Sequence, residues 1–211
     1  MTSETKHASS PKTPFIAFLS YRHADPDRAW ASWLVRRIES YRVPRHLGLG
    51  RRRLGKVFRD DDELGASSDL SAAIVDALER SQHLVVICSP RTPESRWVDR
   101  EIQQFHDLGK GERIVAFLGE GSPRDSFPQA LRDLQREPLA ADARARAGLS
   151  ARRARENALL RVLARLIGCE FDDLRQREQH RRQRFWRAVA LHAASETRSC
   201  LRQALEVPGV H

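Results

Sequence analysis

The chain has 211 residues, 40% of them hydrophobic, and a formal net charge of +9. This length and composition are sufficient for one domain with a buried core and an additional segment. The first fourteen residues, MTSETKHASSPKTP, are too polar for a signal peptide, and no apolar stretch approaches the roughly 18 residues of a membrane span. Three widely spaced cysteines outside any C-x-x-C pattern argue against a disulfide framework or zinc site, and they favour a reducing cytoplasm.

The positive charge is unevenly distributed along the chain. Residues 138–211 carry fifteen Lys or Arg against eight Asp or Glu, a net charge of +7, which leaves +2 for residues 1–137. A nucleic-acid-binding domain is expected to concentrate basic residues on its folded unit. Nucleic acid is therefore an unlikely partner for a nearly neutral domain with a basic tail.

The first predicted element is a strand over residues 15–20, FIAFLS, which has no polar alternation and is typical of a strand buried on both faces. It ends in the polar run Ser20–His23, and ligands of open α/β sheets bind at the carboxyl ends of strands. Asp25 is predicted to cap a helix in which apolar residues recur at helical spacing from Trp30 to Tyr41.

Further strands and helices alternate along the rest of the domain. Asp69 is predicted to cap the second helix, and the acidic run Asp60–Glu63 is predicted to be a solvated surface loop rather than a metal site. The remaining predicted strands lie at 57–58, 83–89, 113–118 and 138–140. The second helix is predicted to end near Arg80, and the later helices are predicted to carry Trp97, Glu101 and Phe105 after Ser95, then Leu131 and Leu134, and finally the stripe from Leu159 to Ile167.

This alternation predicts a flavodoxin-like α/β fold with a mostly parallel five-stranded sheet, strand order 2-1-3-4-5, and helices on both faces. The segment SYRHADPD contains no glycine, which argues against a Rossmann cofactor site or a P-loop. The predicted organisation is a disordered N-terminus at 1–13, a domain at 14–169, and a basic helical tail, partly disordered, at 170–211.

Three segments in this order resemble the Toll/interleukin-1 receptor (TIR) family: FIAFLSYRHAD, KVFRDDDELGASSDLSAAIVDALERSQHLVVICSP and SRWVDREIQQF. The resemblance spans roughly Phe15 to Ile167 and implies the TIR fold. NAD-cleaving members carry a glutamate four residues after a tryptophan, and Trp97 and Glu101 match that pattern. Receptor and adaptor members usually have Pro-Gly in the loop after the second strand, and this chain has none there, which puts receptor-style scaffolding in doubt.

Cleavage of NAD at the nicotinamide-ribose bond is chemistry that one carboxylate can support. The leaving group departs as neutral nicotinamide and needs no proton, whereas ordinary glycoside hydrolysis uses a second, acidic carboxyl group. A glutamate beside the ribose stabilises the oxocarbenium-like transition state. We therefore predict Glu101 as the catalytic residue of an NAD glycohydrolase, with NAD as substrate, no cofactor and no metal.

The other predicted site residues surround this glutamate. An i, i+4 pair shares one helix face, so the indole of Trp97 is expected beside the carboxylate, and Arg22 or Arg59 is expected to bind the pyrophosphate. The substrate-binding candidates are Ser20, Tyr21, Arg22, His23, Phe58, Arg59 and Trp97. Trp97 is expected to be mostly core and, even in the catalytic interpretation, to pack more than it contacts ligand. In the alternative interpretation Glu101 is a solvated acid beside Arg96 or Arg100, and the domain is a non-catalytic module for TIR-TIR contacts.

The basic tail has six arginines from Arg175 to Arg187. A solvated helix or partly disordered segment is the simplest interpretation. The alternative is an amphipathic contact, through Phe185, Trp186 and Leu191, with an anionic membrane surface or a partner helix. The resemblance adds self-association through TIR-TIR contacts, and the expected location is cytoplasmic, with membrane-peripheral attachment through the tail as the alternative.

Overall fold

The computed structural model of the chain describes residues 14–43, 53–59, 70–134 and 140–176. The chain divides into two compact units, Met1–Gly168 and Cys169–His211. The first unit contains the complete sheet and the helices that cover it, so every predicted site residue that the structure describes belongs to this unit.

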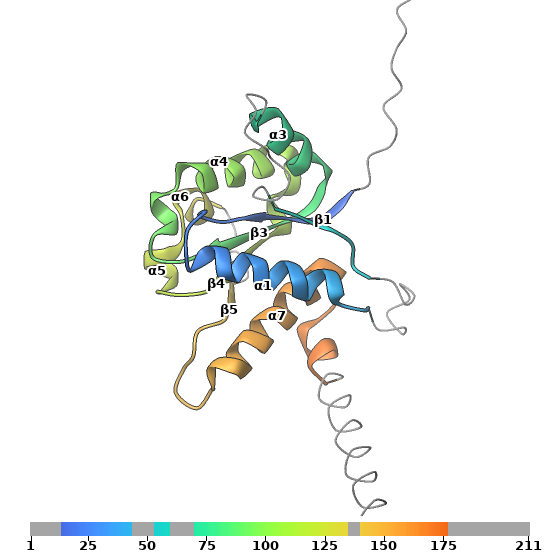
Figure 1. The fold of residues 1–211 in the computed structure, drawn as a ribbon, viewed down its shortest axis with the longest axis vertical. Coiled ribbons are helices and arrows are strands. Elements are labelled where there is room, and N and C mark those ends of the chain that lie inside the picture. Colours follow the sequence, from blue (N-terminus) through green and yellow to red (C-terminus); the bar gives the residue numbers. More distant parts are fainter. Residues whose placement is uncertain (1–13, 44–52, 60–69, 135–139, 177–211) are drawn as a thin grey trace, which may run out of the picture. The chain divides into compact units, whose positions relative to one another are not determined.

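A five-stranded sheet forms the centre of the first unit (Figure 1). Its strands are β1 (Phe15–Ser20), β2 (Val57–Phe58), β3 (Ser81–Cys88), β4 (Ile114–Leu118) and β5 (Ala140–Asp142). All neighbouring strands are parallel, and their order is β2-β1-β3-β4-β5. The predicted flavodoxin-like strand order is confirmed. Strand β1 lies between β2 on one side and β3 on the other, so the sheet extends from β1 first in one direction and then in the other.

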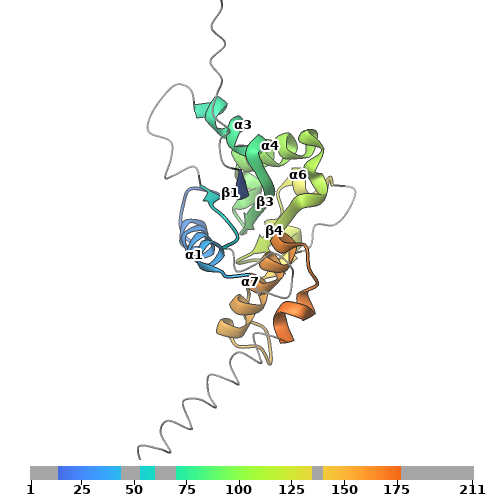
Figure 2. The same ribbon diagram turned by 90° about the vertical axis from the view of Figure 1, so that its right-hand side faces the viewer.

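Helices cover both faces of the sheet, as Figures 1 and 2 show. One face carries α1 (Asp27–Ser40) and α7 (Ala151–Ile167), which contact each other. The opposite face carries α3 (Leu70–Arg80) and α4 (Arg96–Phe105), and the short α6 (Gln129–Arg132) packs against α4. Because parallel strands are joined by crossover helices, both faces of such a sheet are buried.

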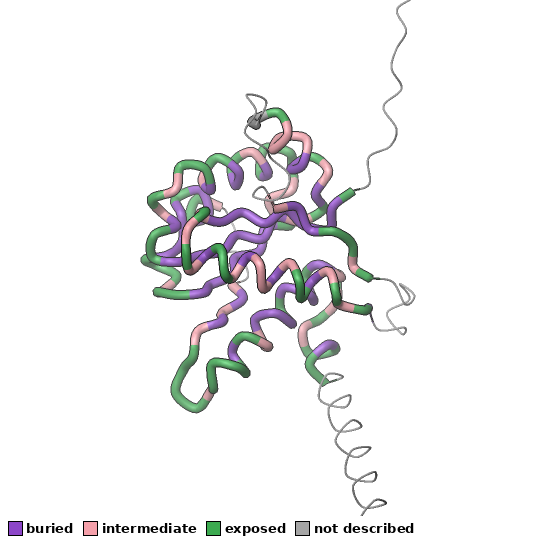
Figure 3. Tube along the Cα trace, in the orientation of Figure 1, coloured by how far each residue is buried: buried purple, intermediate pink, exposed green. Residues whose placement is uncertain are grey.

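The strands are almost wholly buried (Figure 3). Alternate side chains of a strand point to opposite faces of the sheet. Phe117 points toward α1, where the ring of Trp30 packs edge-on at a centroid distance of 5.2 Å. The core on the other face, beneath α3 and α4, includes Phe18, Leu84, Val86, Cys88, Ala116, Leu118, Val98, Ile102 and Phe105. This alternation decides which polar side chains at the strand ends face which helix.

Several local predictions need correction. Asp25 does not cap α1, because Pro26 occupies the capping position and no side chain there accepts a helix N–H. β3 begins at Ser81, directly after α3, two residues before the predicted start. The short elements α5 (Pro123–Ser126), η2 (Thr92–Glu94), η3 (His106–Lys110) and η4 (Gly111–Arg113) were not predicted, because segments of three to five residues show no periodicity.

Some predictions fall outside the described residues. These are the acidic run Asp60–Glu63, the capping role of Asp69, the first two residues of the predicted edge strand at 138–140, and the tail from residue 177 onward, which includes Phe185, Trp186 and Leu191. In the second unit the structure describes residues 169–176, which are helical from 171 to 176. Within the described part of the chain, no helix combines the length and apolarity that crossing a bilayer requires.

Candidate active site at the carboxyl ends of β1 and β3

A hydrogen bond between Ser20 and Glu101 joins the end of β1 to α4. Ser20 shares the face of Phe18, two residues earlier, so its side chain points toward α4. Its Oγ donates to Oε2 of Glu101 at 2.5 Å. Both residues are buried, and Glu101 retains only 7% exposure. The contact holds a carboxylate at the sheet edge where α/β proteins bind ligands.

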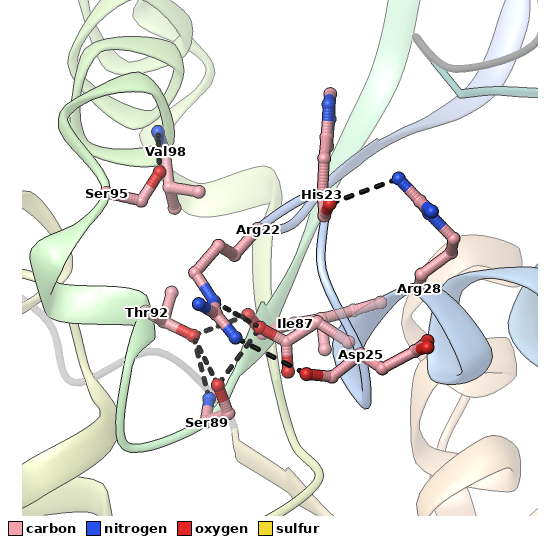
Figure 4. Close-up of polar contacts among 10 residues, drawn as sticks. Arg22, His23, Asp25, Arg28, Ile87, Ser89, Thr92, Ser95 and Val98 are labelled. Carbon is pink, nitrogen blue, oxygen red and sulfur yellow. Dashed lines mark hydrogen bonds and ion pairs between the residues drawn. The ribbon is translucent and has the colours of Figure 1, made fainter.

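The position of Glu101 is set by the packing of its helix. Ser95 caps α4, since its hydroxyl accepts a hydrogen bond from the backbone N–H of Val98, a contact drawn in Figure 4. Val98, Ile102 and Phe105 insert fully into the core below the helix. Glu101 is adjacent to this apolar stripe, which explains why its side chain faces Ser20 rather than solvent.

The exposure of Trp97 and Glu101 contradicts two local expectations, a tryptophan in the core and a solvated glutamate. Trp97 is 59% exposed and therefore is not a core residue. The guanidinium of Arg100 lies 5.3 Å from the centre of its indole ring. Glu101, in contrast, is buried, so it is not a solvated surface acid. The structure thus presents an exposed indole one helical turn before a buried carboxylate.

Tyr21 and His23 continue the chain beyond β1. Tyr21 is buried, and its ring centre lies 4.9 Å from that of His23. His23 is exposed, and its backbone carbonyl accepts a hydrogen bond from Nη2 of Arg28 at 3.1 Å. Both residues lie at the same sheet edge as Ser20.

Phe58 ends β2, the strand beside β1, and Arg59 follows it. Phe58 is a core residue whose ring stacks on Phe18 at a centroid distance of 5.1 Å. Arg59 donates from Nη1 to the hydroxyl of Ser32 at 2.7 Å, which directs it toward α1 on the opposite face of the sheet. Of the two predicted arginines, Arg22 lies two residues after Ser20 and pairs with Asp27 at the start of α1, whereas Arg59 follows β2 and contacts Ser32 further along α1.

A second polar cluster, missed by the sequence analysis, supports Arg22 (Figure 4). Nε of Arg22 lies 3.6 Å from Oδ2 of Asp27, and its Nη2 donates to the Asp25 carbonyl at 3.4 Å. Oδ2 of Asp27 also accepts a hydrogen bond from Ser89 Oγ at 3.0 Å. Thr92 accepts from the Ser89 backbone N–H at 2.8 Å and lies within hydrogen-bonding distance of the Ser89 hydroxyl.

Asp27 is an unusual member of this cluster because it is wholly inaccessible to solvent. Burial raises its pKa, while the hydrogen bond from Ser89 and the charge of Arg22 act in the opposite direction. Its Oδ1 is buried with no hydrogen-bond partner among the described residues. The rule that polar residues follow strand ends could have identified Ser89, but Asp27 was hidden inside a predicted helix.

The described residues contain no group of three His, Cys, Asp or Glu side chains placed to hold a metal ion. The arrangement instead provides a buried carboxylate, a hydroxyl donor, an exposed indole and a guanidinium at one edge of the sheet. A carboxylate stabilises developing positive charge, and a guanidinium binds phosphate oxygens. Groups of these two kinds suit a substrate that carries phosphate and develops positive charge at its reacting carbon.

Comparison with known proteins identifies the family. A family model described as TIR domain matches residues 17–153. The chain is 32% identical over 107 residues to a protein named NAD(+) hydrolase ApTIR from Actinoplanes sp., a match that covers 51% of this chain and 14% of that relative. The chain therefore matches only a small part of the length of the relative.

Two solved structures show similarity at low sequence identity. The TIR domains of the activated Roq1 resistosome, which directly recognises the pathogen effector XopQ, align with a TM-score of 0.35 and 23% identity over 48% of this chain and 55% of theirs. The TIR domain of the Toll-related receptor TRR-2 from Hydra magnipapillata aligns with a TM-score of 0.41 and 20% identity over 60% of this chain and 83% of its own. The family model covers well over half of the chain, from β1 into α7, and the chain belongs to the TIR domain family.

Proposed function

We propose that this TIR domain hydrolyses NAD at the bond between nicotinamide and ribose, with Glu101 as the catalytic residue. The observation that carries the proposal is the buried Glu101 carboxylate, held by the Ser20 hydroxyl at 2.5 Å at the carboxyl end of β1. The name of the Actinoplanes relative, NAD(+) hydrolase, supports the same substrate. Trp97, Tyr21 and His23 are the proposed contacts to the rest of the substrate.

The reaction requires stabilisation of positive charge rather than a proton donor. The bond between ribose C1′ and the pyridinium nitrogen breaks, and its electron pair remains on the nitrogen of neutral nicotinamide. The sugar becomes oxocarbenium-like, and Glu101 stabilises that charge. Water then forms the new bond to C1′ and loses a proton, which gives ADP-ribose.

Ser20 has a positioning role in this mechanism. Its hydroxyl donates to one carboxylate oxygen of Glu101 and so fixes the orientation of the group. Held in this orientation, the carboxylate can stabilise the positive charge that develops on the ribose. No cofactor is needed, because the neutral leaving group departs without redox or acid chemistry.

The proposed location of this reaction is the cytoplasm. Both cysteines within the described residues, Cys88 and Cys169, are free thiols, and free thiols persist in a reducing compartment.

The leaving-group chemistry provides a direct test. Purified chain is incubated with NAD or with NADH, and free nicotinamide and its reduced form are measured by chromatography. NAD is expected to release nicotinamide, whereas NADH is expected to remain intact, because its dihydropyridine ring carries no positive charge. Release from neither compound at high protein concentration would contradict the proposed activity.

Self-association is the second part of the proposal. Trp97 at 59% and Leu108 at 37% are the large hydrophobic side chains that the described part of the chain leaves exposed, and Trp97 lies on the helix that carries Glu101. Exposed aromatic side chains are enriched at protein interfaces. The same observation favours the non-catalytic alternative, in which this helix serves TIR-TIR contacts alone.

A further inference from the structure

We propose that Asp27 is a positioning residue that holds Arg22 as the phosphate-binding group of the site, an inference that rests on the proposed cleavage of NAD. The guanidinium of Arg22 forms an ion pair with the Asp27 carboxylate, with Nε 3.6 Å from Oδ2. Its Nη2 also donates a hydrogen bond to the Asp25 carbonyl at 3.4 Å. Two contacts in different directions restrict a side chain that otherwise has four rotatable bonds.

The Asp27 carboxylate, which pairs with Arg22, is itself held by residues of the loop after β3. Oδ2 of Asp27 accepts from Ser89 Oγ at 3.0 Å, and the Ser89 backbone N–H donates to Thr92 Oγ1 at 2.8 Å. Thr92 in turn donates to the Ile87 carbonyl at 3.3 Å, inside β3. Figure 4 shows this chain of contacts between Arg22 and the loop. The guanidinium is thereby linked, through Asp27 and the loop after β3, to the backbone of β3.

This cluster is poorly arranged for stability. Asp27 is fully buried, and both its Oδ1 and the Nε of Arg22 lack a hydrogen-bond partner among the described residues. Buried polar groups left unsatisfied destabilise a fold, and such exceptions in native structures call for a functional explanation. Burial also raises the pKa of Asp27, which means that its surroundings disfavour the charged carboxylate.

Arg22 is also suitably placed and exposed for a ligand. Its side chain retains 22% of its accessible surface, and it lies two residues after Ser20, whose hydroxyl contacts Glu101. The pyrophosphate is the anionic part of NAD, and guanidinium groups bind phosphate oxygens in paired geometry. Of the two predicted arginines, Arg22 is the one that follows the strand carrying Ser20, whereas Arg59 follows β2 and donates to Ser32.

A double-mutant cycle tests the inference. Arg22→Ala, Asp27→Asn and the double variant are compared with the natural chain, with the exposed Asp107→Asn as matched control. Each single change is expected to raise the KM for NAD about tenfold with a smaller effect on kcat, which is the scale of one charge-assisted contact. The double variant is expected to be no worse than Arg22→Ala, because Asp27 acts through Arg22.

Three further measurements distinguish a positioning role of Asp27 from a folding defect, and distinguish this inference from the proposed function. Nicotinamide riboside has the same scissile bond and no phosphate, so its cleavage should not change in the variants. Calorimetry with ADP-ribose requires no turnover, and its Kd should rise about tenfold in Asp27→Asn. Thermal unfolding should show that Asp27→Asn is at least as stable as the natural chain, since it removes a buried charge.

The outcomes are distinguishable. Additive losses in the cycle, equal losses on NAD and nicotinamide riboside, or an unchanged KM in Asp27→Asn would overturn the role of Asp27. A natural chain that binds ADP-ribose through Arg22 but releases no nicotinamide would overturn the proposed cleavage while supporting phosphate binding. A chain that neither binds ADP-ribose nor cleaves NAD would overturn both.

Discussion

The hydrogen bond from Ser20 to Glu101 links residues 81 positions apart in the sequence, and the proposed chemistry depends on it. Ser20→Ala removes the donor and leaves a carboxylate whose orientation is no longer fixed from β1. We expect kcat for NAD cleavage to fall about tenfold, the scale of one hydrogen bond to a charged group. Steady-state kinetics of nicotinamide release measures this effect.

A double variant provides the control for that prediction. If Ser20 acts by orienting Glu101, then Ser20→Ala should add little to the loss already caused by Glu101→Gln. An independent further loss in the double variant would show that Ser20 acts on the substrate by another route.

His83 makes the stability of the domain pH-dependent. Burial lowers the pKa of His83 below its usual 6.5, while Nδ1 donates to the Ile16 carbonyl at 3.2 Å. The unfolded chain therefore takes up a proton at a higher pH than the folded chain does. The free energy of unfolding should fall as the pH drops from 7.5 through 6.5 toward the lower pKa of the folded state.

His83→Gln isolates this contribution, because glutamine does not titrate. Urea unfolding at pH 7.5 and pH 5.5 should show a smaller difference between the two pH values in the variant than in the natural chain. Equal differences in the two proteins would mean that His83 is not the group responsible.

At the same scale, the sequence could predict some of the site residues and not others. Ser20 and Arg22 follow a buried strand, so the strand-end rule identifies them, and Glu101 is implied by the TIR resemblance. Asp27 contacts Ser89 across 62 positions, and nothing in either local sequence indicates that pairing. Phe58 and Arg59 also follow the strand-end rule, but Phe58 packs into the core and Arg59 contacts Ser32 on α1.

At the scale of elements, the end of α3 depends on a lysine from a distant turn. Nζ of Lys110 donates to the carbonyls of Glu79 at 2.6 Å, Ser81 at 3.0 Å and Leu78 at 3.4 Å. An ammonium group has three donors, and the last carbonyls of a helix lack partners within it. Lys110 therefore joins the end of α3 to the start of β3.

Lys110→Met keeps the apolar stem and removes these donors. We expect the free energy of unfolding to fall by about 1–2 kcal/mol, as for the loss of a charged hydrogen-bond donor from a helix end. Chemical denaturation measures the change, and Lys56→Met, at an exposed position, serves as the control. A loss of similar size in the control would point to a general effect of charge.

The strands and long helices could be predicted because burial imposes periodicity. FIAFLS and RIVAFL read as strands covered on both faces, and they became β1 and β4. The predicted cap at Asp25 was wrong because Pro26 precedes α1 and the carboxylate that starts the helix, Asp27, is buried against Ser89. Tertiary contacts thus overrode local capping preferences.

At the scale of the whole molecule, the proposed self-association makes activity depend on concentration. Trp97 is exposed beside Arg100 on the helix that carries Glu101, so an interface on this surface would adjoin the site. The rate of nicotinamide release per molecule should rise with protein concentration. Sedimentation measurements on the same samples should show oligomers over the same range.

A specific activity that stays constant from dilute to concentrated samples, with a monomer throughout, would contradict activation by self-association. It would leave the cleavage chemistry intact, because the Ser20–Glu101 contact forms within one chain.

The most direct test of the central claim is the rate of nicotinamide release by Glu101→Gln relative to the natural chain. The exposed Glu94→Gln, which removes an acid seven positions earlier, is the matched control, and circular dichroism verifies that all three proteins are folded. The proposed mechanism predicts a loss of about 10²–10³-fold in Glu101→Gln and none in Glu94→Gln. A folded Glu101→Gln variant that cleaves NAD at the natural rate would contradict the assignment of Glu101 as the catalytic residue.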